Sequence, residues 1–334
     1  MSLNKASNII LSKCMGLKNR ESCLVVSDFL LKDIGFSLFR NSLNMTKKSK
    51  IVFIPIPKAH GCEPPKDTAK QMLNHDVSLL ATTKSLSHTK ARKNASKNGA
   101  RIASMPGITK DMMERALNVD FNKIRKLNQK LISILKNKKS VKITTKKGTD
   151  IKFFVKTRKW TSDDGIYTNK GSFGNLPAGE VFIAPLEYKT NGIIIADASV
   201  GGLGMADKQI KIQVKDGFIK RIEGGKVAKN FERSLKGKLY RNVAELGIGT
   251  NPKAKITGEV LEDEKILGTC HIAFGNNNHF GGKVDVPFHI DFVIRKPTIY
   301  ADDILVMKDG KFKITKTKTF YIKKQSKKKC PQKK

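Results

Sequence analysis

The chain has 334 residues, of which 39% are hydrophobic, and it carries a formal net charge of +36 at pH 7. This length provides enough apolar side chains for one large domain or two ordinary ones. Apolar runs such as residues 51–57 and 192–196 are far too short to cross a bilayer. The N-terminus has no long apolar stretch typical of a secretory signal, so we expect a cytoplasmic protein with no membrane partner.

The excess of basic residues raises the question of a nucleic-acid partner, because lysine and arginine clusters bind phosphates. Most of these residues are single lysines between apolar ones, as in residues 211–222 and 311–324, which is typical of the solvent faces of strands. Residues 245–300 differ, with six basic and seven acidic side chains and three of the six histidines. We therefore expect nucleic acid not to be the main partner, and we look for chemistry in this window.

The first part of the chain alternates strands and helices. Residues 21–28 and 50–57 read as buried strands, with an amphipathic helix between them that extends to Arg40. A third strand at 78–83, a helix at 88–99 and a strand with a turn at 100–107 continue the pattern. The alternation predicts an N-terminal doubly wound (Rossmann-like) α/β domain over residues 1–140.

Residues 109–137 have the longest helical pattern, which begins at Thr109 as a plausible N-cap and breaks near residues 118–120. From Val141 the pattern becomes β-rich, starting with a hairpin around Lys147 and Gly148.

These patterns predict a β-rich α+β metal-binding domain over residues 141–322 and a disordered basic tail over residues 323–334. The GxG pattern of residues 247–249 does not match a phosphate-binding loop, and we interpret it as turn chemistry.

The segment FHIDFVI predicts a strand that projects His289 and Asp291 from the same face, because residues two apart in a strand point the same way. An imidazole beside a carboxylate in an apolar strand is costly unless the two bind something. Glu180, Glu245, Glu264 and His271 supply further donors of the types that hold one or two divalent metal ions. The alternatives are surface carboxylates at Glu180 and Glu264, a core histidine at 271, and an internal hydrogen-bonded pair at 289 and 291.

The chain resembles the metallo-aminopeptidase family typified by aminopeptidase T and aminopeptidase S. The resemblance runs through LVVSD, SHTKARKNASKNGARIASMPGIT, GTDIKFF, NLPAGEVF, AELGIGTNP, DEKILGTCHIAFGNN and HIDFV. It implies an aminopeptidase, a hydrolase that releases N-terminal residues from peptides, and a homodimer. It also implies two divalent ions, zinc, cobalt or manganese, with Glu245 as a bridging ligand or as the carboxylate that handles the water proton. The ligands it implies are Glu180, Glu245, Glu264, His271, His289 and Asp291, although the spacing at Glu264 differs by two residues.

One position departs from that family, whose catalytic tyrosine is replaced by Asn278. The neighbouring His279 is our candidate for the missing polarising role. In an alternative, His271, His289 and Asp291 alone form a two-histidine, one-carboxylate site for a single iron(II). The peptidase fold is similar to that of the ring-cleaving 2,5-dihydroxypyridine dioxygenase, which works in this way. A further alternative is a polyanion-binding protein without catalysis.

Overall fold

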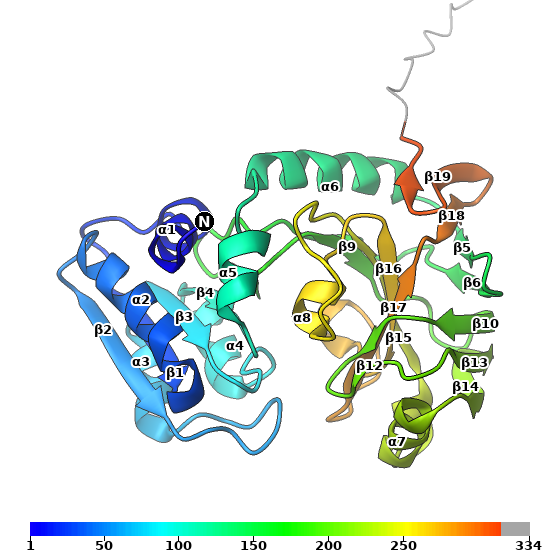
Figure 1. Ribbon diagram of the computed structural model, residues 1–334, viewed down its shortest axis with the longest axis horizontal. Coiled ribbons are helices and arrows are strands. Elements are labelled where there is room, and N and C mark those ends of the chain that lie inside the picture. Colours follow the sequence, from blue (N-terminus) through cyan, green and yellow to red (C-terminus); the bar gives the residue numbers. More distant parts are fainter. Residues whose placement is uncertain (315–334) are drawn as a thin grey trace, which may run out of the picture.

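The computed structural model describes residues 1–314, which form two lobes linked by a long helix, α6 (Figure 1). The predicted tail at 323–334 lies outside the described residues. Among those that are described, no helix is both long and apolar enough to cross a membrane.

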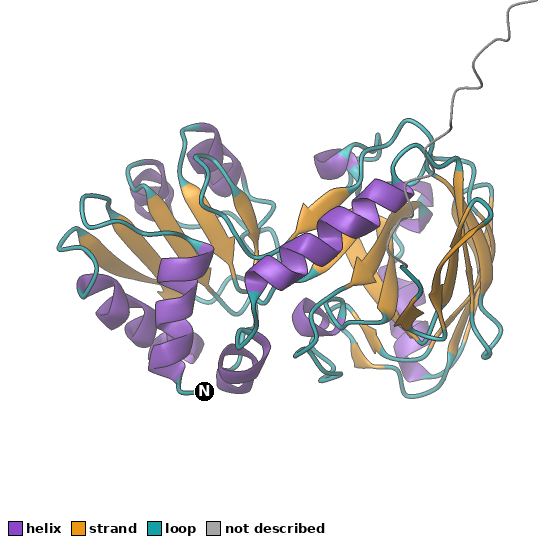
Figure 2. Ribbon diagram, turned by 90° about the horizontal axis from the view of Figure 1, so that it is seen from above, coloured by secondary structure: helices purple, strands orange, loops and turns teal. Residues whose placement is uncertain are grey.

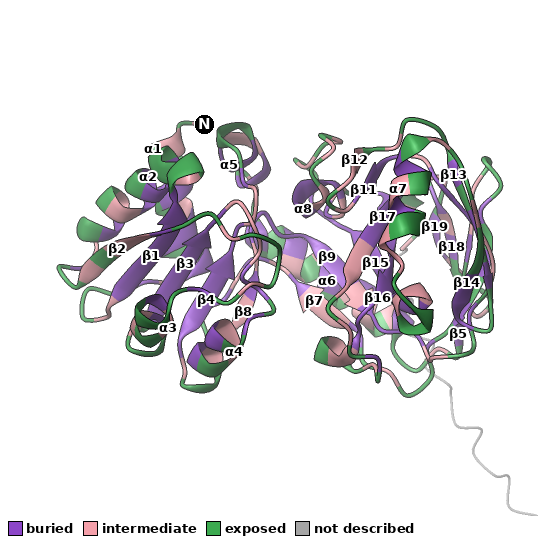
Figure 3. Cartoon of the chain, turned by 90° about the horizontal axis from the view of Figure 1, so that it is seen from below, coloured by how far each residue is buried: buried purple, intermediate pink, exposed green. Residues whose placement is uncertain are grey.

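The first lobe is built on a parallel five-stranded sheet whose strands run in the order β2-β1-β3-β4-β8. The strands are β1 (Cys23–Asp28), β2 (Ser49–Ile54), β3 (Val77–Ala81), β4 (Arg101–Ser104) and β8 (Phe173–Asn175). Every residue of β1, β3 and β4 is buried, because helices cover both faces of the sheet (Figure 3).

The covering helices confirm the predicted doubly wound fold. Alternate strand residues point to opposite faces, so Val25 and Leu79 belong to one hydrophobic cluster and Val26 and Leu80 to the other. On the first face lie α1 (Leu3–Ile9) with its π-helical extension (Ile10–Cys14), α2 (Lys32–Leu43) and α5 (Lys110–Ala116). On the second face lie α3 (Lys66–Leu73) and α4 (Lys90–Lys97), and a 3-10 turn (Phe29–Leu31) precedes α2.

Helix α6 (Phe121–Leu135) crosses from one lobe to the other (Figure 2). As the sequence predicts, it is separate from α5, and Thr109 and Asp120 cap the two helices through their side chains. The buried amide of Asn128 donates from Nδ2 to the Glu180 carbonyl over 2.8 Å and accepts from Thr250 Oγ1 over 2.7 Å. Helix α6 is thereby fixed to the strand that begins at Glu180.

Two antiparallel sheets pack face to face in the second lobe around a shared hydrophobic core (Figure 2). The eight-stranded sheet has the order β14 (Phe218–Glu223), β13 (Ile210–Lys215), β10 (Asn191–Ala196), β6 (Asp150–Phe154), β5 (Ser140–Thr144), β18 (Thr298–Ala301), β19 (Ile304–Lys308) and β20 (Lys311–Phe312). The seven-stranded sheet has the order β12 (Gly204–Met205), β11 (Ser199–Val200), β17 (His289–Arg295), β16 (Thr269–Gly275), β15 (Val243–Gly249), β9 (Glu180–Ile183) and β7 (Thr161–Asp163). The helical elements of this lobe are α7 (Lys226–Ser234), α8 (Val260–Asp263) and the 3-10 turns η3 (Lys238–Arg241) and η4 (Asn278–Phe280). The predicted hairpin is confirmed as β5 and β6.

Candidate metal centre

Four adjacent strands of the seven-stranded sheet carry five of the six predicted donors. Glu180 opens β9, Glu245 lies in β15 and His271 in β16, while His289 and Asp291 lie two apart in β17. Glu264 follows the last residue of α8. The structure therefore brings together residues that span more than 100 positions of the sequence.

Each strand-borne donor is paired on at least one side with a glycine or an alanine. His271 pairs with Gly247, Glu180 with Gly249 and His289 with Gly275. Ala273 stands between Glu245 and Asp291, paired with both. Directly paired side chains on one face lie close together, so these small residues leave space beside each donor.

Gly247 shows how tight this arrangement is. A Cβ atom at Gly247 would lie 2.0 Å from Cε1 and Nε2 of His271, too close for any real contact. The expectation that residues 247–249 form a turn is wrong, because they lie inside β15. The glycine is needed so that the imidazole can pack over the neighbouring backbone.

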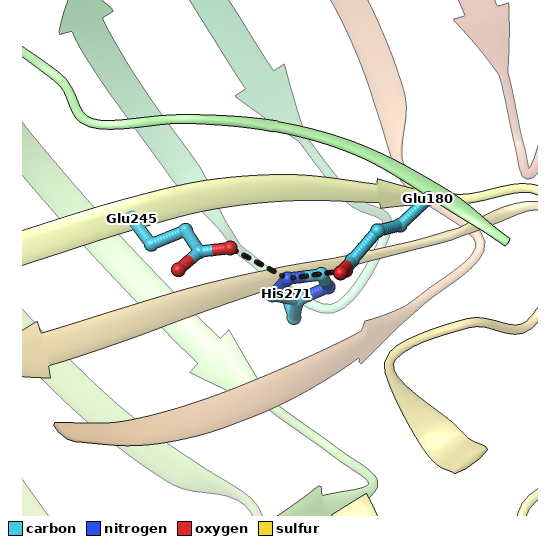
Figure 4. Close-up of side chains that lie close together, drawn as sticks. All are labelled: Glu180, Glu245 and His271. Carbon is cyan, nitrogen blue, oxygen red and sulfur yellow. Dashed lines mark ion pairs between the residues drawn. The ribbon is translucent and has the colours of Figure 1, made fainter. Parts of the chain in front are cut away.

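The donor atoms approach one another closely. His271 Nε2 lies 3.3 Å from Glu180 Oε2 and 3.5 Å from Glu245 Oε1 (Figure 4). His289 Nε2 lies 3.4 Å from Glu245 Oε2 and 3.5 Å from Asp291 Oδ1.

Three groups of possible ligands, each with donor atoms within 4.8 Å of one another, overlap to contain all six predicted residues. They are Glu180, Glu245 and His271; Glu245, His289 and Asp291; and Glu264, His271 and Asp291.

Contacts behind the donors fix the orientation of one imidazole. His289 Nδ1 lies 2.8 Å from the Asn276 carbonyl oxygen, to which its N–H donates, so that Nε2 faces the carboxylates. The Nδ1 atom of His271, in contrast, is buried and has no hydrogen-bond partner within the described part of the chain.

The carboxylates and imidazoles shift one another's pKa values strongly. Burial acts to raise the pKa of Glu245, but hydrogen bonds from His271 and His289 outweigh it and lower the value to about 2. Burial acts to lower the pKa of His271, but Glu245 and the neighbouring carboxylates raise it to about 9. The pKa of His289 is raised in the same way by Asp291 and Glu245. Without a cation, both imidazoles therefore hold a proton at neutral pH and pair with carboxylates.

Sequence reasoning missed Lys265, which is almost completely buried in this centre. Its Nζ lies 2.6 Å from both Glu180 Oε1 and Glu264 Oε1. Burial raises the pKa of Glu264 to about 8, despite the opposing effect of Lys265. The only sign of it in the sequence is that Lys265 directly follows Asp263 and Glu264, but mixed charges of this kind usually mark a solvent-exposed segment.

Asn278 and His279 belong to the turn η4 beside this centre. His279 is exposed and belongs to none of the three donor groups. Its ring instead stacks on His88 of the first lobe, with centroids 5.1 Å apart. The polarising role of His279 stays a prediction.

The centre fits a divalent cation. It offers two imidazoles and several carboxylates within a small volume, and Glu180 Oε2 is buried without a hydrogen-bond partner among residues 1–314. A buried carboxylate oxygen in that state is stabilised by a cation.

The profile of the NicX family, 2,5-dihydroxypyridine 5,6-dioxygenase, matches residues 18–314. The chain belongs to this family. Among solved structures, the 2,5-dihydroxypyridine dioxygenase from Pseudomonas putida KT2440 superposes with a TM-score of 0.81 at 19% identity, covering 93% of this chain and 96% of that one. Wild-type AmpT from Thermus thermophilus has a TM-score of 0.71 at 14% identity, covering 93% of this chain and 98% of that one. A search of curated proteins found no match.

The family match overturns our main functional expectation. The predicted aminopeptidase, a metalloprotease and hydrolase, is wrong, and the dioxygenase alternative is the one supported. The resemblance to aminopeptidase T does hold at the level of the fold, which both solved structures share. The sequence motifs behind that resemblance correspond to the shared fold and to candidate metal donors. Neither the fold nor the donor types determine which reaction is catalysed.

Proposed function

We propose that the chain is an iron(II)-dependent dioxygenase that opens a hydroxylated aromatic ring of the dihydroxypyridine type. The observation that carries the proposal is the family match over residues 18–314, which includes every donor of the metal centre. Two histidines and a carboxylate are the donor set typical of mononuclear iron(II) oxygenases.

In this proposal His271, His289 and Asp291 hold the metal. When bound, iron(II) would supply the redox chemistry through which O2 reacts with the ring. Glu245 contacts Nε2 of both imidazoles, the atoms that would bind the metal, so its carboxylate borders the metal position, while the Asn276 carbonyl keeps His289 Nε2 turned toward the centre. Phe280 packs edge-on against His289, with ring centroids 6.1 Å apart, and gives this side of the centre an apolar wall.

The position of Lys265 favours one metal ion per chain instead of the two expected from the resemblance. Its ammonium group already lies between Glu180 and Glu264, 2.6 Å from an oxygen of each. These carboxylates are thus partly neutralised, and the donors without a lysine contact are Glu245, Asp291 and the two histidines.

The reaction needs no further reductant. A dioxygenase adds both atoms of O2 to the ring and breaks one carbon–carbon bond, so the ring supplies all four electrons. The chain's task is to hold the metal and the ring together and to keep competing reactions out.

The test is oxygen uptake by protein loaded anaerobically with iron(II), with 2,5-dihydroxypyridine as the substrate. We expect one O2 consumed per ring opened, together with loss of the ring's ultraviolet absorption, and one iron per chain by elemental analysis. His289→Ala and Asp291→Asn should abolish both iron retention and oxygen uptake.

Matched controls are His75→Ala in the first lobe and Asp303→Asn at the exposed turn after β18, which leave the metal centre intact. Oxygen-independent hydrolysis of aminoacyl reporter substrates that needs two metal ions per chain would overturn the proposal.

A further inference from the structure

Two segments from different lobes meet beside the metal centre. One is the start of α4 with the loop before it, which carries His88, Arg92 and Lys93. The other is the turn η4, which carries His279. The rings of His88 and His279 stack with an interplanar angle of 16°, and Lys93 Nζ lies 3.4 Å from His279 Nε2. Lysine has only N–H donors, so the imidazole nitrogen accepts.

This group of four residues, which we call the basic face, lies next to the metal donor His289. Phe280 of the same turn packs against the His289 ring. Although His88 keeps an exposed edge, the protein around it and the nearby charges of His289 and His279 lower its pKa to about 3. Loss of solvent contact and the charge of Lys93 lower the pKa of His279 as well, with Asp285 opposing. Both imidazoles are therefore neutral at pH 7, and the charge of the basic face comes from Arg92 and Lys93.

Neither cation has a carboxylate partner in the described part of the chain. Arg92 donates from Nε to the Ser87 carbonyl over 2.6 Å, and its guanidinium lies 4.0 Å over the Phe173 ring. Within residues 1–314 its two Nη groups make no hydrogen bond, nor does Lys93 form an ion pair there. Asp285, the acidic group that faces His279, accepts a hydrogen bond from Asn276 Nδ2 instead.

We propose that the basic face binds an acidic substituent of the substrate, so that the preferred ring carries a carboxylate in addition to its hydroxyl groups. Lys93 and the free Nη groups of Arg92 offer charge-assisted hydrogen bonds to such a group. The turn η4 connects them to the metal centre, because His279 contacts Lys93 and the next residue, Phe280, packs against His289. A ring bound at the metal centre would therefore extend its substituent toward them. The proposal rests on the ring-cleaving function given above and names the substrate class for it.

The test compares two rings that differ only in the carboxylate: 2,5-dihydroxybenzoate and 1,4-dihydroxybenzene. Binding of each to zinc-loaded protein without oxygen is measured by calorimetry. We expect the benzoate to bind about tenfold more tightly, and Lys93→Met to remove most of this preference, as the loss of one hydrogen bond to a charged group would. Lys93→Arg should restore it. Lys97→Met, which makes the same change at an exposed position of the same helix, should leave it unchanged.

Equal affinity for the two rings in the wild-type protein would overturn the proposal, as would an equal loss of affinity for both in Lys93→Met. Since binding is measured without turnover, a chain that cleaves no ring but keeps the carboxylate preference would refute only the dioxygenase function. Efficient cleavage of neutral rings with no carboxylate preference would refute only the basic face.

Discussion

Glu245 is the side chain that links the two imidazoles of the metal centre, because one of its oxygens approaches each. Those contacts hold the pKa of its carboxyl at about 2 against the opposing effect of burial. A group with so low a pKa is a poor proton acceptor at neutral pH. The resemblance implies that Glu245 is either a bridging ligand or the carboxylate that handles the water proton. Its contacts are with the Nε2 atoms that would bind a metal, so we treat it as a candidate ligand and not as a proton acceptor.

We predict that Glu245→Gln lowers metal affinity by at least about tenfold to a hundredfold, because it removes a charged donor and effects of that size are typical even for residues that only support the ligands. Titration calorimetry with zinc measures it. Glu223→Gln, at an exposed position of β14, is the control and should bind metal like the wild type. Unchanged affinity in Glu245→Gln would show that Glu245 is not a metal donor.

The titration of His271 and Glu264 predicts how metal-free stability depends on pH. Both pKa values are raised in the folded chain, that of His271 from 6.5 to about 9 and that of Glu264 from 4.5 to about 8. The folded state thus binds more protons than the unfolded one, and stability falls as pH rises through these values. We expect the melting temperature of the metal-free protein to fall between pH 6 and pH 9.

Metal affinity should rise over the same range, because a ligand histidine must lose its proton to bind. Thermal scans with a chelator and with zinc measure both trends. A metal-free melting temperature that increases from pH 6 to pH 9 would contradict these shifts.

At the level of secondary structure, strand pairing sets the space around the donors. We predict that Gly247→Ala displaces His271, because the new methyl group would overlap the imidazole. Overpacking of this kind typically costs about 1–3 kcal/mol, and metal retention should fall with it.

The control is Gly237→Ala, where the backbone is extended and no atom lies within 4 Å of the added methyl group. Chemical denaturation and elemental analysis of both variants measure the difference. Full metal occupancy in Gly247→Ala would mean that β15 can move away from His271.

Helix and strand positions were largely predictable from sequence. The strands of residues 21–107, helices α2 and α4 and the break before α6 follow from hydrophobic period and caps, which are local signals, whereas helix α3 was not predicted. Strand β8 was not predicted, since its three residues show no period and its place beside β4 depends on a return of the chain to the first lobe. Gly247 was misread for a related reason, because the residue that requires it lies on another strand.

Across the whole molecule, the two lobes are joined by an ion pair between Arg115 of α5 and Glu262 of α8. Arg115 Nη2 donates to Glu262 Oε2 over 3.0 Å, and Nη1 donates to the other carboxylate oxygen. The Glu262 side chain is fully buried. The adjacent residues Asp263 and Glu264 lead directly into the metal centre, so this contact ties α8 to the first lobe.

We predict that Arg115→Met destabilises the protein by about 3 kcal/mol, because it leaves a buried charge without its partner. Arg221→Met removes an exposed ion pair of β14 and should change stability by less than about 1 kcal/mol. Urea denaturation compares the two variants. Equal stabilities would mean that Glu262 is satisfied by its backbone contacts alone.

Oligomeric state also belongs to this scale, where the homodimer implied by the resemblance stays a prediction that light scattering can test.

The net charge of +36 is most informative when it is divided along the chain. The acidic stretch at 245–300 contains five of the six donors, and the cations of the basic face lie in the other lobe, beside it in space.

The sequence by itself determined the alternating strands and helices of the doubly wound first lobe, the β-rich second half and the six candidate donors, because side-chain period and residue type are local properties. Tertiary structure decided which carboxylates meet which histidines, that Lys265 lies between Glu180 and Glu264, and that Lys93 approaches His279 from 186 positions away. Those contacts depend on strand register and on the packing of the two lobes, which no local pattern encodes. The class of reaction was misjudged for the same reason, since peptidase and dioxygenase share a scaffold and the reaction depends on what surrounds the metal.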